Sequence, residues 1–266
     1  MRVQRISLAI ILAVIAAVPA FAASGKRPAP TGAWAGAPAE YTRFTAAELS
    51  RGFLALAFGS DLRLGTKSNN IRRFDTAVRL HLVAGGNDAR TQTYRRIAGE
   101  FAQKIPNLNM RLVDDLSSAN VVVRLIDEKD FFAAMEAAYG RETARSFVAQ
   151  TDPQCMTSLK SQADGKAVRA DVFIIVDQGD EVFFDCAYHE TLHAFGLSNH
   201  DDRNAWTTLN QKRTVGYLSV YDRAMLTLLY DPRIQPGMTA SQVRRILPHA
   251  IKDLHLDLRL GPRLAD

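Results

Sequence analysis

The stretch that most constrains this chain is 182–202, VFFDCAYHETLHAFGLSNHDD, because it sets His189 and His193 four residues apart with Glu190 between them. Residues four apart on an α-helix differ by only about 40° in azimuth, so both imidazoles can converge on one ion. Neutral imidazole is a good Zn²⁺ donor, and the ion lowers the pKa of a bound water to roughly 7. A glutamate at this position is placed to take the water's proton. We therefore predict one Zn²⁺ per chain, with Glu190 as the catalytic base.

The surrounding residues predict the helix that carries these groups. Apolar side chains fall on the face opposite the histidines, at Phe184, Ala187, Tyr188, Thr191, Leu192 and Phe195. This pattern is typical of a helix that is buried on one side and borders a cleft on the other. Gly196 follows and is expected to end the helix, because glycine readily adopts φ > 0. The alternative is a chance H-E-x-x-H string on a surface helix, whose histidines bind nothing.

The segment resembles the metzincin peptidase pattern H-E-x-x-H-x-x-G-x-x-H over its first eight positions. The third metzincin histidine would fall on Asn199, whereas this chain has His200 one position later. We therefore predict His200 as the third zinc ligand, with Asp201 and Asp202 as the alternatives. Metzincins also place a methionine turn beneath the metal. The corresponding stretch here contains Trp206, which would supply an apolar floor.

The N-terminus predicts export. Residues 1–22 join Arg2 and Arg5 to an apolar run from Ile6 to Val18 and an A-x-A site at 20–22, the pattern of a cleaved secretory signal peptide. The alternative, a membrane anchor, is disfavoured because the run is short. We therefore expect a periplasmic or secreted protein without stable membrane insertion after the signal peptide is removed.

The charge of the chain argues against nucleic-acid binding. Removal of the signal peptide takes away two arginines and no acid, which lowers the formal net charge from +5 to +3. That excess is small, and no aromatic stacking pattern accompanies the arginines of the mature chain. The expected partner is a peptide or protein substrate.

Two cysteines, Cys155 and Cys186, remain in the exported chain and would meet an oxidising compartment. A single structural disulfide is therefore expected. It would tie the segment before the site to the first turns of the metal-binding helix, and closing a loop of this size is worth roughly 3 kcal/mol. A nucleophilic cysteine is the less favoured alternative, because no base is suggested beside either residue.

The remaining patterns predict one α+β domain. Residues 23–44, rich in Pro, Gly and Ala, are expected to form a flexible leader, and residues 45–266 a single metzincin-like domain. Thr45 and Glu48 match a capping box at a helix start, and Asp180 is a candidate N-cap for the metal helix. Strands are predicted at 76–84, 109–113, 120–126, 155–161 (an edge strand) and 167–177, and helices at 88–104, 129–150, 220–229 and from 239. This order predicts a mixed twisted sheet with packed helices, as in a zincin core.

A second resemblance covers most of the mature chain. It rests on FTAAELSRGF at 44–53, CAYHETLHAFGL at 186–197 and YDRAMLTLLYDPRIQPGMTASQVRRIL at 221–247. These segments are similar to those of a secreted proteobacterial family of unknown function. The resemblance implies the fold and the export more firmly than it implies catalysis.

Together the patterns predict a secreted zinc-dependent metallopeptidase that hydrolyses peptide bonds through a zinc-bound water. Tyr217 or Tyr221 is a candidate for stabilising the oxyanion, although packing is the commoner role for such tyrosines. The predicted edge strand at 155–161 is a candidate for pairing with an extended substrate. The alternative function is that of a non-catalytic cell-envelope protein, which keeps the zincin scaffold and binds a partner in the cleft.

Overall fold

The computed structural model describes residues 26–58, 69–150, 154–254 and 259–260, so the predicted signal peptide lies outside the described residues. A five-stranded sheet with the order β5-β4-β6-β8-β7 forms the centre of the molecule. The strands are β4 (Val78–Val83), β5 (Met110–Leu112), β6 (Val121–Ile126), β7 (Cys155–Ser161) and β8 (Ala167–Ile175). The first four in spatial order are parallel, and β7 runs antiparallel to β8. The predicted mixed sheet, with 155–161 at its edge, is confirmed.

Seven α-helices lie within the described residues. They are α2 (Ala46–Ala57), α3 (Asp88–Lys104), α4 (Glu128–Tyr139), α5 (Arg141–Gln150), α6 (Asp180–Ala194), α7 (Val220–Leu229) and α8 (Ala240–Lys252). The shorter elements are β1 (Lys26–Arg27), β2 (Glu40–Tyr41), β3 (Arg43–Phe44), β9 (Arg259–Leu260) and a 3-10 turn at Leu116–Ser118. None of the described helices has the length and apolar character needed to cross a lipid bilayer.

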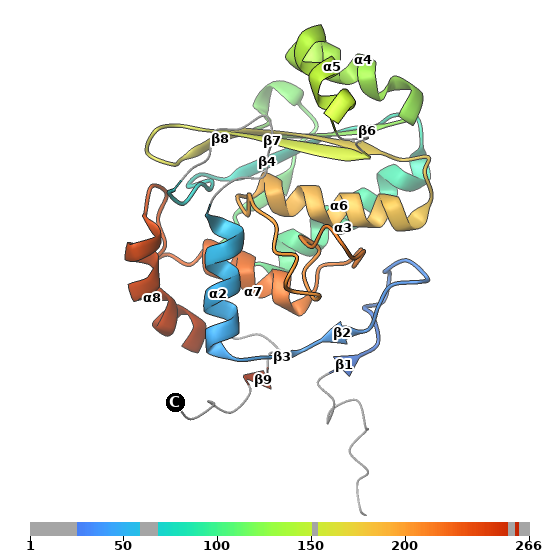
Figure 1. Ribbon diagram of the computed structural model, residues 1–266. Helices are drawn as coiled ribbons and strands as arrows, with labels where there is room; N and C mark the ends of the chain where they lie inside the picture. Colours follow the sequence, from blue (N-terminus) through green and yellow to red (C-terminus); the bar gives the residue numbers. More distant parts are fainter. Residues whose placement is uncertain (1–25, 59–68, 151–153, 255–258, 261–266) are drawn as a thin grey trace, which may run out of the picture.

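The helices form layers on both faces of the sheet. Helices α4 and α5 cover one face, and α3 and α6 cover the other, with α2, α7 and α8 further from the sheet (Figure 1). The larger hydrophobic core lies on the α6 side, and a smaller one lies between the sheet and α4 and α5. β8 suits this position because its last six residues, 170–175, are buried, as expected for a strand covered on both faces. The fold is therefore a single α+β unit with α6 against its main core.

Two predicted segments differ from the structure. The predicted helix at 129–150 is two helices, because Gly140 adopts φ 82° and ends α4 before α5 begins. The predicted flexible leader is wrong for residues 26–44, which pack against the domain. The buried Glu40 carboxylate accepts a hydrogen bond from the Val220 backbone N–H at 2.6 Å. Trp34 lies so close to Gly216 that an added Cβ would come within 2.6 Å of its ring.

The surroundings of α6 confirm some predictions and correct others. Gly196 has φ 113° and ends the helix, as predicted. Asp180 is not the N-cap; Gly179 takes that position with φ 95°, and Asp180 forms an ion pair with Arg90 at 2.8 Å. The helix is buried on nearly all sides rather than on one, because the chain beyond Gly196 folds back over it. The predicted disulfide between Cys155 and Cys186 is present and ties β7 to α6.

Candidate metal centre

Three histidines meet where α6 ends. α6 carries His189 and His193 one turn apart, and the turn at Gly196 brings His200 back to them. The Nε2 atom of His189 lies 2.9 Å from that of His200 and 3.1 Å from that of His193, and the third distance is also 3.1 Å. Among the residues that the structure describes, this is the one group of histidine, cysteine or acidic side chains that could hold a metal ion.

Backbone carbonyls orient two of the rings. Nδ1 of His189 lies 2.9 Å from the Thr208 carbonyl oxygen, and Nδ1 of His193 contacts the carbonyl oxygen of Leu197. A carbonyl only accepts, so each Nδ1 carries the proton, and in the neutral ring Nε2 then presents a lone pair. This is the arrangement that the outer-shell partners of metal-binding histidines usually impose.

Burial keeps two of these imidazoles neutral. Desolvation is the main cause that lowers the pKa of His189 to about 3, and the neighbouring His200 adds to the shift. Burial, followed by the two neighbouring rings, also lowers the pKa of His193 well below its ordinary value. Neutral imidazole is the form that binds a metal, so protons compete weakly for these two sites at neutral pH.

The three Nε2 atoms fit a cation better than they fit one another. Nε2 of His189 and of His193 both present lone pairs, so a proton on His200 would satisfy at most one of the three contacts. Zinc bonds imidazole nitrogen at about 2.0–2.1 Å, so tetrahedral ligands lie about 3.3 Å apart. The observed separations are a few tenths of an ångström shorter than that. The donor set therefore suits a single small divalent ion.

The centre opens beside His200. A cavity of about 480 Å³ is bordered by His200, by the last turn of α2 and by the loop at 199–203. Asn199, the position of the third metzincin histidine, serves here as a structural tie, because its Nδ2 donates to the Ala55 and Phe58 carbonyl oxygens at 2.9 and 3.2 Å. The end of α2 thus fixes the loop that presents His200.

The two alternative ligands lie outside the histidine group. The Asp201 carboxylate accepts a hydrogen bond from Arg203 Nε at 2.7 Å. The Asp202 carboxylate accepts one from the Gln211 backbone N–H at 2.9 Å and pairs with Lys212 at 3.4 Å. Neither aspartate belongs to the group that could hold the ion. His200 is therefore the third member.

Glu190 is a buried carboxylate on the same helix. Its Oε2 atom is shielded from solvent and has no hydrogen-bond partner. Burial is the main cause that raises the pKa of Glu190 to about 8, and the nearby charge of Asp185 adds to it, while a hydrogen bond from Thr157 opposes the rise. The Thr157 hydroxyl also donates to the Glu190 backbone oxygen at 2.9 Å, which holds α6 against the edge strand β7. In the metal-free protein this carboxyl group therefore holds its proton at neutral pH and exchanges it about one pH unit higher.

A second buried carboxylate, Asp222 on α7, supports His189 through Thr208. Its Oδ2 atom accepts hydrogen bonds from Thr208 N–H at 3.0 Å, from Thr208 Oγ1 at 3.0 Å and from Ser219 Oγ at 2.9 Å. Its Oδ1 atom accepts one from Thr207 Oγ1 at 2.6 Å. These bonds fix the 207–208 turn, whose Thr208 carbonyl orients His189. Asp222 therefore acts on the centre through Thr208.

Three further predicted residues serve other purposes. The Tyr217 hydroxyl donates to the Pro38 carbonyl oxygen at 3.1 Å. Tyr221 is buried with its hydroxyl against Gly52, and Trp206 stacks on Tyr41 with ring centroids 4.8 Å apart. The cavity that Trp206 lines includes none of the three histidines. The tyrosines are packing residues, and Trp206 is not the floor of the centre.

Sequence reasoning missed the groups that position the rings. The carbonyl oxygens of Thr208 and Leu197 belong to the backbone, so no residue type could reveal them. The sequence did contain a signal at Asp222, but it indicated a helix cap and not a support for the site. It follows Ser219 at the start of a helix, where its acidic side chain looked like part of an ordinary cap.

The fold and the site define an α+β protein with a partly buried three-histidine group that could hold a metal ion. The family described as "Protein of unknown function (DUF2927)" matches residues 46–249, and the chain belongs to it. Neither a curated protein nor a solved structure matches the chain.

Proposed function

We propose that this protein is an exported, zinc-dependent peptidase. The observation that carries the proposal is the convergence of three Nε2 atoms within 3.1 Å, with two rings held in the metal-binding tautomer by backbone carbonyls. Nitrogen donors of this kind suit zinc, and a site with three protein ligands leaves a position open for chemistry.

In this proposal three residues of the chain bind the ion and a fourth transfers the proton. When bound, zinc would acidify water and polarise a carbonyl group. His189, His193 and His200 would hold the ion, and Glu190 would take the proton of the attacking water at its carboxylate. The same carboxyl would then give that proton to the departing amine. Its raised pKa, about 8 in the absence of metal, suits a group that must both accept and return a proton.

Two features of the fold support a peptide as the substrate. β7 forms the edge of the sheet and is tied to α6 by the disulfide and by the Thr157 hydrogen bond. An extended peptide can add to such an edge through backbone hydrogen bonds, which would place it beside the helix that carries Glu190. The helix that carries the metal ligands packs against a mixed sheet whose edge strand is β7. This is the arrangement that we expect of a zincin-like fold.

Export is the proposed setting of this activity. The signal-peptide pattern at 1–22 supports it, and the disulfide suits an oxidising compartment such as the periplasm or the exterior.

The test compares Glu190→Gln with Glu181→Gln, a matched change at an exposed position of the same helix. Both variants and the parent are incubated with a mixed peptide library, and their zinc content is measured. We expect Glu190→Gln to keep its zinc and to cleave at least about 100-fold more slowly, because a general base contributes about that much. Glu181→Gln should match the parent. Equal cleavage by Glu190→Gln and the parent would refute the mechanism with Glu190 as the base. A parent that cleaves no peptide would refute the peptidase and favour the non-catalytic binding protein.

A further inference from the structure

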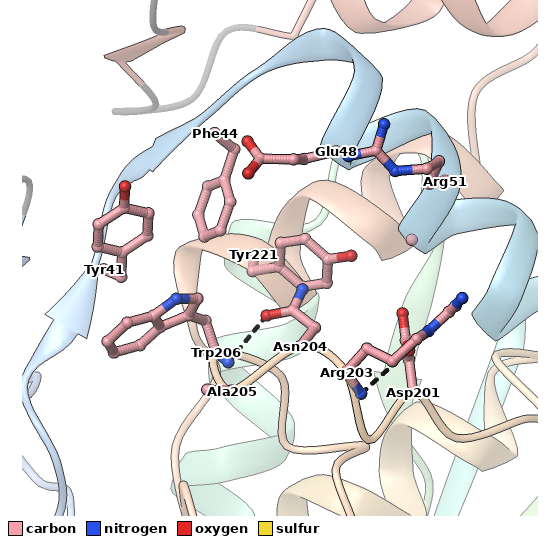
Figure 2. A pocket seen from close by; sticks show the side chains of 11 residues that line it. Tyr41, Phe44, Glu48, Arg51, Asp201, Arg203, Asn204, Ala205, Trp206 and Tyr221 are labelled. Carbon is pink, nitrogen blue, oxygen red and sulfur yellow. Dashed lines mark hydrogen bonds and ion pairs between the residues drawn. The ribbon is translucent and has the colours of Figure 1, made fainter.

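A second cavity lies next to the histidine centre. It has a volume of about 520 Å³ and is formed by α2, by the loop at 201–206 and by the segment around β2 and β3. Figure 2 shows four aromatic rings gathered on one side of this cavity and two arginines on the other. The rings are those of Tyr41, Phe44, Trp206 and Tyr221, and the arginines are Arg51 and Arg203.

The aromatic side is a rigid wall. The rings of Tyr41 and Trp206 are stacked, with centroids 4.8 Å apart and an angle of 18° between their planes. Phe44 packs edge-on against Tyr41 at 5.1 Å. Tyr221 reaches α2 only because residue 52 is glycine, since a Cβ there would lie 1.5 Å from its hydroxyl oxygen. A wall built from mutually packed rings loses little entropy when an apolar group binds to it.

The opposite side of the cavity carries two arginines, of which Arg203 is already in an ion pair with Asp201. Arg51 is exposed and has no hydrogen-bond or ion-pair partner within the described part of the chain. Arg203 uses Nε to bind Asp201, and its side chain is otherwise 78% exposed. The one other acid that lines the cavity, Glu48, accepts hydrogen bonds from the Thr45 backbone N–H and hydroxyl at 2.7 and 2.8 Å in the α2 capping box. The cavity therefore offers a carboxylate the Arg51 guanidinium and those N–H groups of Arg203 that Asp201 does not bind.

This cavity adjoins the one beside His200. Asp201 and Arg203 border both, and α2 supplies a wall to each. A peptide that extends from the histidine centre past His200 into this cavity would therefore pass Arg203, which borders both cavities. The arrangement selects a ligand that combines a carboxylate with an aromatic ring, because guanidinium binds carboxylate in a planar fork.

We propose that this cavity is a specificity site for a substrate segment that carries a glutamate or aspartate beside an aromatic side chain. The inference rests on the proposed peptidase function, for which it names the preferred substrate. A peptide is favoured over a nucleotide because the Tyr41 and Trp206 rings already stack on each other, with no parallel gap between them for a base.

Binding is tested separately from cleavage by isothermal titration calorimetry with the full mature chain carrying Glu190→Gln. The probes are acetyl-Gly-Phe-Glu-Gly-amide, its Glu→Gln and Phe→Ala analogues, and AMP. We expect the Phe-Glu peptide to bind at least about tenfold more tightly than either analogue and than AMP. Adding Arg51→Ala or Arg203→Ala should abolish the preference for glutamate, and Trp206→Ala the preference for phenylalanine. Arg95→Ala removes an exposed arginine of α3 that does not line the cavity, so it should change neither.

Three results would overturn the inference: equal affinity for the three peptides, a glutamate preference that survives both arginine changes, or tighter binding of AMP than of any peptide. A failure of the proposed function is a different outcome. In that case the Glu190→Gln protein binds the Phe-Glu peptide selectively, yet the parent cleaves neither this peptide nor the library. The cavity would then stand as a peptide-binding site without peptidase activity.

Discussion

Removing the side chain of Asp222 should weaken zinc binding although Asp222 does not touch the histidines. In Asp222→Ala the 207–208 turn loses the acceptor of three hydrogen bonds, Ser219 loses the acceptor of a fourth, and the buried Thr208 N–H is left without a partner. The Thr208 carbonyl then no longer holds the Nδ1 proton of His189 in place. Loss of such an outer-shell support typically costs about 10- to 100-fold in metal affinity, or about 1.4–2.7 kcal/mol.

The matched variant Asp222→Asn separates hydrogen-bond geometry from charge. The amide oxygen can take the position of Oδ2 and keep its three donors, while the amide N–H faces the Thr207 hydroxyl, which can accept. We therefore expect the zinc affinity of Asp222→Asn to lie much closer to that of the parent than to that of Asp222→Ala. Zinc is titrated against a chromophoric chelator well below the melting temperature of each variant. Parental affinity in folded Asp222→Ala, or equal losses in the two variants, would refute the reasoning.

Three further predictions concern stability. In the metal-free protein, folded Glu190 holds a proton between its unfolded pKa of 4.5 and its folded pKa of about 8, so rising pH in this range destabilises the parent relative to Glu190→Gln. Paired urea titrations should show that the difference in unfolding free energy between the two proteins changes by about 1.4 kcal/mol per pH unit. A difference that stays constant with pH would contradict this. Gly196→Ala should cost about 2 kcal/mol or more, because φ is 113° and the new methyl would lie 2.1 Å from a backbone oxygen, whereas Gly99→Ala, which meets nothing within 4 Å, should not destabilise. Replacing Cys155 and Cys186 by serine should cost about 3.7 kcal/mol for a separation of 31 residues, and an unchanged melting temperature would show that the bridge contributes nothing.

Local sequence signals were sufficient to predict an element or a bond where a single local interaction decides the structure. The capping box of Thr45 and Glu48 placed the start of α2, and the match of 88–104 to α3 followed from its helical apolar period. The disulfide followed from the cysteine count and the export signal. His200 was predicted from the resemblance to the metzincin pattern, whose third histidine would fall one position earlier, on Asn199.

The remaining features depend on contacts between distant segments. Residues 26–44 looked like a flexible leader because Pro and Gly are common in linkers, yet Glu40 and Trp34 dock on the segment 216–220 far along the chain. The nearly complete burial of α6 likewise depends on the chain that folds back after Gly196. Gly140 splits one predicted helix because its φ of 82° ends α4, and a glycine in a periodic segment does not by itself reveal this.

The central claim is that three imidazoles hold one ion, and elemental analysis of the mature protein, isolated without added metal, tests it most directly. We predict about one zinc per chain in the parent and in His249→Ala, which changes an exposed histidine of α8. We predict less than about a tenth of that in His200→Ala, because two remaining imidazoles bind zinc far more weakly than three. A parent without bound metal, or a His200→Ala variant that keeps as much zinc as the parent, would contradict the account.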